Sequence, residues 1–212
     1  MTMTRRDVLW RALASGLALG AAWPVPVQAD AVPDLLADIG LRLETSPVLR
    51  GDFEQTKTLK GFKRPLVSHG VFVMARGKGV LWTTKAPFAS TLVVTRERLV
   101  TVTEGSTQQI DTRQEPGLRA VNDMLMALLA GDLQALASRF NSAGSLQGAQ
   151  GWRVSLTPRD AALARFIARI ELEGDRHVRQ VRLAEASGDD SRIVFSNHAA
   201  STLSPAEAER LN

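Results

Sequence analysis

The chain has 212 residues, carries a formal net charge of +4 at pH 7 and contains no cysteine. This length suits one domain or two small ones, and a domain of this size can bury a sizeable core without cross-links. The missing cysteine excludes disulfides, thiol nucleophiles and thiolate metal sites.

The first 29 residues have the pattern of an export signal. Three arginines flank an apolar stretch over residues 8–23, which is too short to stay in a membrane as a spanning helix. The small-x-small motif Val27-Gln28-Ala29 follows as a cleavage site. We expect residues 1–29 to be removed on export, and residues 30–212 to form a single domain. Arg5-Arg6 approaches the twin-arginine pattern, so both the twin-arginine and the general secretory routes stay open.

Removal of the signal lowers the net charge, because the segment contains three arginines and one aspartate. The formal charge of the mature chain is therefore +2 rather than +4. A nucleic-acid-binding protein would need a basic stripe with exposed aromatic residues, whereas the arginines here alternate with acids. We expect no nucleic-acid partner.

The first half of the mature chain predicts one helix followed by strands. Residues 33–45 place leucine and isoleucine at helical spacing between two prolines, which indicates an amphipathic helix. Gly77-Lys78-Gly79 suits a hairpin turn between two strands, and those flanking strands argue against a phosphate-binding loop. The strands expected in this half are residues 49–58, 67–76, 80–84, 90–95, 99–103 and 108–111.

The second half predicts a helical pair and more strands. An apolar stripe over residues 121–136 indicates two helices interrupted near Gly131. Ser204-Pro205 followed by Glu207 indicates the capped start of a short terminal helix. The strands expected between these helices are residues 152–157, 165–173, 177–184 and 192–197, with Phe166, Ala168, Ile170 and Leu172 on the dry face of the second.

About ten antiparallel strands with helices before and among them predict an α+β fold. Its main element would be a large curved antiparallel sheet with helices on one face. The strands between residues 53 and 88 stand out because they are apolar on both faces. Such a strand needs protein on both faces, or one face must line a cavity for an apolar ligand.

Four side chains are expected to meet on one face of these strands. Phe72 and Met74 share one face of a strand with Arg76, and Trp82 is expected to meet that face across the hairpin. The residues alone leave two interpretations open: an ordinary hydrophobic core, or an apolar cavity with one cation at its edge.

The sequence lacks the usual signatures of catalysis and metal binding. His69, His177 and His198 are scattered without ligand spacing, so a structural or surface role is expected for each. There is no Gly-x-Ser-x-Gly motif, which disfavours a secreted lipid hydrolase. We expect no metal, no cofactor and no enzymatic activity.

The order of these features resembles the LolA family of periplasmic lipoprotein carriers. It comprises a leading helix, Phe53-x-Gln55, Gly70-x-Phe72 leading to Arg76, and Trp82 six residues after that arginine. The chain departs from the family where Gly77 follows the arginine, because LolA proteins usually have proline there.

This resemblance implies both a fold and a function. The fold is an incomplete β-barrel with helices covering its concave face. The function is that of a monomeric, soluble periplasmic carrier that binds the acyl chains of lipoproteins and delivers them to the outer membrane. The implied partners are an acylated lipoprotein or other lipid cargo, an ATP-driven inner-membrane exporter complex and an outer-membrane acceptor. Two alternatives stay open: a carrier of another lipid or lipid-linked polyene in a dedicated export pathway, and a lipoprotein-sensing domain.

The resemblance also assigns roles to residues. It implies that Arg76 holds a helical lid shut through hydrogen bonds to backbone carbonyls until acyl chains displace it, a task that suits the several donors of guanidinium. The lid would be formed by residues 121–136. The ligand-binding residues expected on this basis are Phe72, Met74, Arg76, Trp82, Met124, Leu125 and Leu128.

Overall fold

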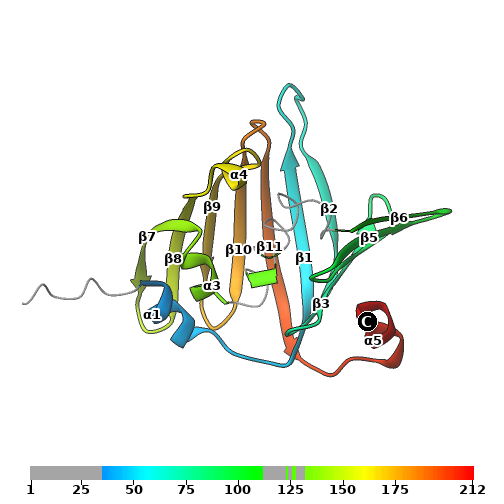
Figure 1. The fold of residues 1–212 in the computed structure, drawn as a ribbon, viewed down its shortest axis with the longest axis horizontal. Coiled ribbons are helices and arrows are strands. Elements are labelled where there is room, and N and C mark those ends of the chain that lie inside the picture. The colour runs from blue at the N-terminus through cyan, green and yellow to red at the C-terminus, as the bar shows by residue number, and fades with distance from the viewer. Residues whose placement is uncertain (1–34, 112–122, 124–125, 128–131) are drawn as a thin grey trace, which may run out of the picture. The chain divides into compact units, whose positions relative to one another are not determined.

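The computed structural model describes residues 35–111, 123, 126–127 and 132–212 (Figure 1). By its contacts the chain divides into Met1–Val32 and Pro33–Asn212, and the description that follows concerns the second unit. The predicted export signal lies outside the described residues. Among those described, no helix has the length and apolar character needed to cross a membrane.

Eleven antiparallel strands form one open sheet in the order β6-β5-β4-β3-β2-β1-β11-β10-β9-β8-β7 (Figure 1). Hairpins connect most neighbours, while β1 pairs with β11 and joins the two halves of the chain. The predicted α+β class with a large, incomplete antiparallel barrel is confirmed. The strand bounds are Val48–Thr58 (β1), Leu66–Ala75 (β2), Gly79–Ala86 (β3), Ser90–Val94 (β4), Arg98–Thr103 (β5), Ser106–Asp111 (β6), Phe140–Gln147 (β7), Gly151–Pro158 (β8), Ile167–Gly174 (β9), Val178–Glu185 (β10) and Asp190–Ala200 (β11).

The described helices are short. Asp123, Met126 and Ala127 also have helical conformation, but most of the helical pair predicted over residues 121–136, including the break near Gly131, lies outside the described residues. The bounds of the described helices are Leu35–Arg42 (α1), Gln134–Ala137 (α3), Ala161–Ala164 (α4) and Pro205–Leu211 (α5).

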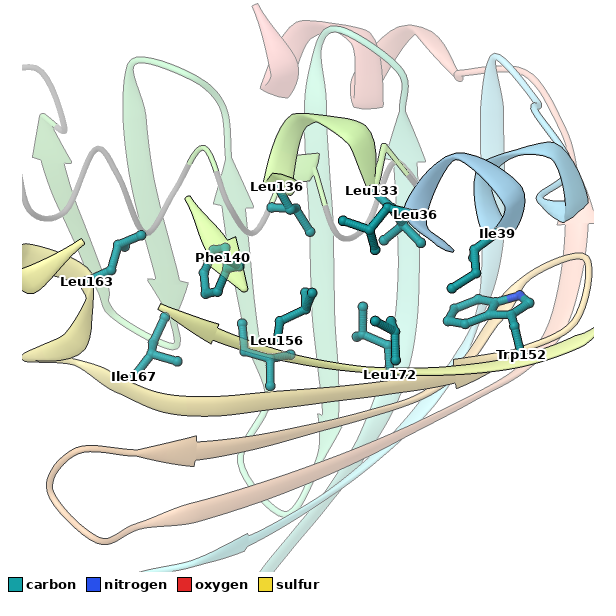
Figure 2. Close-up of a cluster of buried hydrophobic side chains, with 12 residues drawn as sticks. Leu36, Ile39, Leu133, Leu136, Phe140, Trp152, Leu156, Leu163, Ile167 and Leu172 are labelled. Atoms are coloured by element: carbon teal, nitrogen blue, oxygen red, sulfur yellow. The ribbon is translucent and has the colours of Figure 1, made fainter. Parts of the chain in front are cut away.

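The helices α1 and α3 cover the β7–β9 end of the sheet. Leu36 and Ile39 lie three residues apart, hence on one side of α1, and both are buried. Together with Leu133 and Leu136 they pack onto Trp152 and other inward side chains of β8 and β9 (Figure 2). Burial of each such leucine or isoleucine contributes about 1.5–3 kcal/mol. A helix within the predicted range 33–45 is thereby confirmed, over Leu35–Arg42.

The helix α5 covers the opposite face of the sheet, over β3 and β4. Leu211 packs against Val73, Leu81 and Val93. Successive strand residues point to opposite faces, so the neighbours Phe72 and Met74 face the other side. The sequence showed β2 and β3 to be apolar on both faces, and α5 covers one of these two faces.

Two expectations about the second half were wrong or incomplete. Phe166 is half-exposed and Ala168 is exposed, because β9 begins at Ile167 and a bulge in its pairing with β10 shifts the alternation. Ile167 therefore enters the core instead of Phe166. The strand β7 was not predicted, because it is an edge strand of small and polar residues whose side chains are mostly exposed.

Hydrogen bonds of the Glu207 carboxylate hold α5 in place. Glu207 completes a capping box with Ser204, as the sequence predicted, and its two oxygens accept hydrogen bonds from the Arg50 guanidinium at 2.5 and 2.6 Å. The hydrogen bond from Arg50 lowers the pKa of Glu207 to about 2. Because β1 supplies the arginine, this contact ties the terminal helix to the centre of the sheet.

The variant Glu207→Gln tests this contact. The folded-state pKa lies below the ordinary value of 4.5, so the charged contact stabilises the fold above pH 4.5 and its contribution is lost as the pH falls toward 2. We expect urea denaturation at pH 7 to show a loss of about 1 kcal/mol. That difference should disappear near pH 2, and an unchanged difference there would contradict the assignment. Glu209→Gln, an exposed position on the same helix, is the control.

Candidate functional site

An apolar pocket lies on the face opposite α5. Its cavity has a volume of about 230 Å³, just below the roughly 300–1,000 Å³ of typical ligand sites. Strands β1 to β4, β10 and β11 form most of it. The described lining residues are Leu43, Glu44, Leu49, Gln55, Phe72, Met74, Val80, Trp82, Leu92, Val94, Arg176, His177, Val178, Val181, Ile193, Phe195 and His198.

Curvature of the sheet creates this pocket. Leu92 and Val94 on β4 line it together with Val178 and Val181 on β10. Five strand steps separate β4 from β10, which would be about 24 Å in a flat sheet. Both strands contribute to one pocket because the sheet curls around it.

Glycines make room for aromatic rings on the floor of the pocket. Phe53 on β1 pairs with Gly70 on β2, and Gly51 pairs with Phe72 in the same ladder. A Cβ atom on Gly70 would lie 2.8 Å from the Phe53 ring, and one on Gly51 would lie 2.6 Å from the Phe72 ring, so both glycines are needed for this packing. The ring of Phe53 then stacks on Trp82 at 3.8 Å between centroids.

A third strand completes the aromatic floor. Phe195 on β11 meets Phe72 edge-on at 5.4 Å and Trp82 at 5.9 Å between ring centroids. Edge-to-face pairs of this kind add about 0.5–1.5 kcal/mol beyond the area that they bury. These contacts hold the rings in place, so the apolar floor is preformed.

The structure brings some of the predicted site residues together. Phe72, Met74 and Trp82 all line the pocket. Met124, Leu125 and Leu128 lie outside the described residues. Their described neighbour Met126 packs against the cluster that contains Phe72 and Met74.

Arg76 is placed at the edge of the site. It is exposed, lies in the turn between β2 and β3, and its backbone N–H donates to the Pro47 carbonyl at 2.9 Å. It does not belong to the described lining of the pocket. Gly77 in the same turn has a φ of 75°, which confirms the glycine-dependent hairpin turn predicted there.

A polar corner, formed by Glu44, Arg176, His177 and His198, closes one end of the pocket. The Glu44 N–H donates to the Arg176 carbonyl at 2.8 Å, which joins the α1–β1 link to the β9–β10 turn. The imidazoles of His177 and His198 stack at 4.6 Å between centroids, with 7° between their planes. No group of side chains suited to holding a metal ion occurs among the described residues.

His198 is held in its neutral form. Its Nδ1 lies 3.0 Å from Nη1 of Arg179, and since guanidinium has no acceptor, Nδ1 must accept this hydrogen bond. Burial, reinforced by His177 and then by Arg179, lowers the pKa of His198 to about 4. Burial also lowers the pKa of His177. The histidine stack is therefore uncharged at neutral pH and compatible with an apolar ligand beside it.

Sequence reasoning missed the contribution of β10, β11 and the two histidines. Val181 on β10 and Ile193 and Phe195 on β11 follow a period of two, which was a readable signal. His177 and His198 stand 21 positions apart, and only the register of the β10–β11 hairpin brings them together.

An NMR titration of the His198 imidazole tests the polar corner. We expect a midpoint near pH 4 rather than 6.5. Because the unfolded chain binds this proton more readily, stability should fall by about 1–3 kcal/mol as the pH drops from 6.5 to 4. In the variant His198→Gln this part of the pH dependence should be missing. A midpoint near 6.5 in the folded protein would contradict the buried, neutral assignment.

Comparison with known proteins assigns the family. Residues 44–207 match the family described as outer membrane lipoprotein carrier protein LolA, so the chain belongs to the LolA family. No curated protein sequence matches the chain.

Solved structures with a similar fold come from several bacteria. A LolA superfamily protein from Nitrosomonas europaea is 8% identical, with 84% of this chain and 96% of that chain covered, at a TM-score of 0.47. A DUF1329 family protein from Desulfovibrio piger is 13% identical, with 84% and 97% covered, at 0.50. The MucA/MucB complex of Pseudomonas aeruginosa contains a chain that is 18% identical, with 82% and 60% covered, at 0.45. At these identities the likeness concerns the fold alone.

Proposed function

We propose that this protein is a periplasmic carrier that binds the acyl chains of lipoproteins in its pocket and delivers them to the outer membrane. It catalyses no reaction in this proposal. The observation that carries the proposal is the preformed apolar pocket on the open face of a LolA-family sheet. Its aliphatic and aromatic lining suits a flexible hydrocarbon chain.

The free energy of acyl chains explains why such a carrier is needed. Exposing hydrocarbon to water costs about 0.8 kcal/mol per methylene, hence about 12 kcal/mol for a chain of about 16 carbons. A lipidated protein cannot cross an aqueous space unaided at that cost. The cargo must also leave again, and an open-mouthed pocket suits release. Loading would then depend on an inner-membrane exporter and unloading on an outer-membrane acceptor.

The described contacts support a lid over the pocket. Met126 packs on the aromatic floor, while Leu133 and Leu136 further along the same segment are anchored in the core over β8 and β9. An acyl chain that enters the pocket would compete with apolar contacts such as those of Met126. In this proposal Arg76, at the end of β2, holds the lid closed until the cargo displaces it.

Filling the pocket should weaken cargo binding. Val181 lines the pocket on β10, whereas the adjacent Arg182 is exposed and points to the other face of the sheet. We expect Val181→Trp to weaken binding of a fluorescent fatty-acid analogue at least about tenfold, since an added indole occupies the cavity. Arg182→Trp is the matched control and should bind as the wild type does. Equal affinity in both variants would rule out this pocket as the acyl site.

Replacing Arg76, which holds the lid closed in this proposal, should affect delivery of the cargo rather than binding of the cargo. We expect Arg76→Leu to retain bound cargo while transferring it to an acceptor membrane fraction at least about tenfold more slowly, because the lid no longer switches between two states. Lys78→Leu, in the same turn, serves as control. Transfer at the wild-type rate in Arg76→Leu would show that Arg76 does not control the lid.

A further inference from the structure

The hairpin between β1 and β2 ends in an exposed segment that is both cationic and apolar. Residues 57–67 contain four lysines or arginines and no acid. Phe62 in this segment is 69% exposed, and Leu66 and Val67 are exposed as well. Large apolar side chains are rarely left in water as a group unless the surface is used for binding.

The turn between β3 and β4 adds to the same surface. Successive antiparallel strands alternate in direction, so the β1–β2 and β3–β4 connections lie at the same end of the sheet. The ladder between β2 and β3 reaches His69 and Ala86, just before this end. Phe88 in the β3–β4 turn is 82% exposed, and Lys85 beside it is exposed too. We call residues 60–67 and 85–88 together the hairpin tip.

The cations of the hairpin tip are not neutralised within the described part of the protein. Lys63, Arg64 and Lys85 form no ion pair there. The neighbouring carboxylates are engaged nearby: Glu185 pairs with Lys57 at 2.8 Å, and Asp189 accepts the backbone N–H of Lys60 at 2.8 Å. The tip therefore presents a positive potential around exposed aromatic rings.

We propose that the hairpin tip docks the protein reversibly onto an anionic lipid bilayer surface. Aromatic and aliphatic side chains insert at the level of the headgroups, while lysine and arginine meet the lipid phosphates. Two features favour a bilayer over a protein partner. Phe62 and Phe88 stand in turns rather than in a groove with fixed shape, and cations lie beside them on both hairpins.

This docking surface goes beyond cargo binding and is separate from the pocket. The polar corner of the pocket lies near the end of β11 at Ala200, whereas the hairpin tip lies beside the start of β11 at Asp190. A carrier held at a membrane through the tip would keep the turn that contains Arg76, at the other end of β2, away from the headgroups.

Binding to lipid vesicles tests the proposal, with protein exported and processed from the full-length gene. The probes are vesicles of phosphatidylcholine with about one quarter phosphatidylglycerol, and vesicles of phosphatidylcholine alone. We expect binding to the anionic vesicles that weakens as salt is raised, and at least about tenfold weaker binding to the neutral ones. The double variant Lys63→Glu with Arg64→Glu should weaken binding at least about 25-fold, since each cation contributes about fivefold. Phe62→Ser and Phe88→Ser should each weaken it about tenfold.

Two control variants match these changes outside the tip. Lys78→Glu reverses a charge in the β2–β3 turn at the opposite end of the sheet, and Leu41→Ser removes a side chain on α1 that is 87% exposed. Both should bind anionic vesicles as the wild type does. The proposal would be overturned if the wild-type protein did not bind anionic vesicles, or if the tip variants bound them as well as the controls do. In the first case an acidic protein would be the better partner. Fatty-acid binding measured on the same tip variants separates this test from that of the pocket.

Discussion

The whole architecture depends on how the strands β2, β3 and β4 bury two apolar faces. A single antiparallel sheet in water normally has one dry face, yet Phe72 and Val73 are adjacent on β2 and both are buried. The helix α5 solves the problem on one side, where Leu211 packs and Glu207 binds Arg50. On the other side the sheet curls over itself and leaves an apolar pocket.

The contrast between the two ends of the sheet explains why a pocket exists at one of them. Over β8 and β9, Leu36, Ile39 and Trp152 fill the concave side and make an ordinary core. Over β1 to β4 the same side is floored by aromatic rings that rest on glycines, with the polar corner at its edge. One end of the sheet thus provides stability, and the other provides the surface that we propose for the cargo. The interior carries a neutral histidine stack there, so no unpaired charge has to be buried with a hydrocarbon chain.

The local sequence pattern predicted the helices, strands and turns better than it predicted the contacts between them. The run of apolar residues in β2, the glycine turn at Gly77 and the capping box at Ser204 were readable because each depends on residues close in sequence. The stack of His177 on His198 depends on the register between β10 and β11, which the pattern within either strand does not specify. Phe166 was misplaced because a bulge changes the period of two without leaving a proline or glycine to mark it.

The curvature of the sheet was likewise beyond the pattern of any one strand. Val181 lies in a strand that was predicted only as part of the sheet, and it lines the pocket because β10 curls toward β4. The resemblance to LolA implied an incomplete barrel, whereas the order of strands and helices predicted only a curved sheet with helices on one face. Conversely, the paired contacts Phe53 with Gly70 and Phe72 with Gly51 give a physical reason for the Phe-x-Gln and Gly-x-Phe motifs on which the resemblance rests.

Native mass spectrometry of the processed protein, purified without detergent from cells that produce it, tests the central claim most directly. The carrier account predicts that part of the protein carries an acylated lipoprotein, identified by extraction of the bound material. A free lipid or a polyene would keep the carrier function and change the cargo. Protein that is repeatedly empty, even from cells whose exporter is disabled or overloaded, would contradict the account and favour a sensory or structural role.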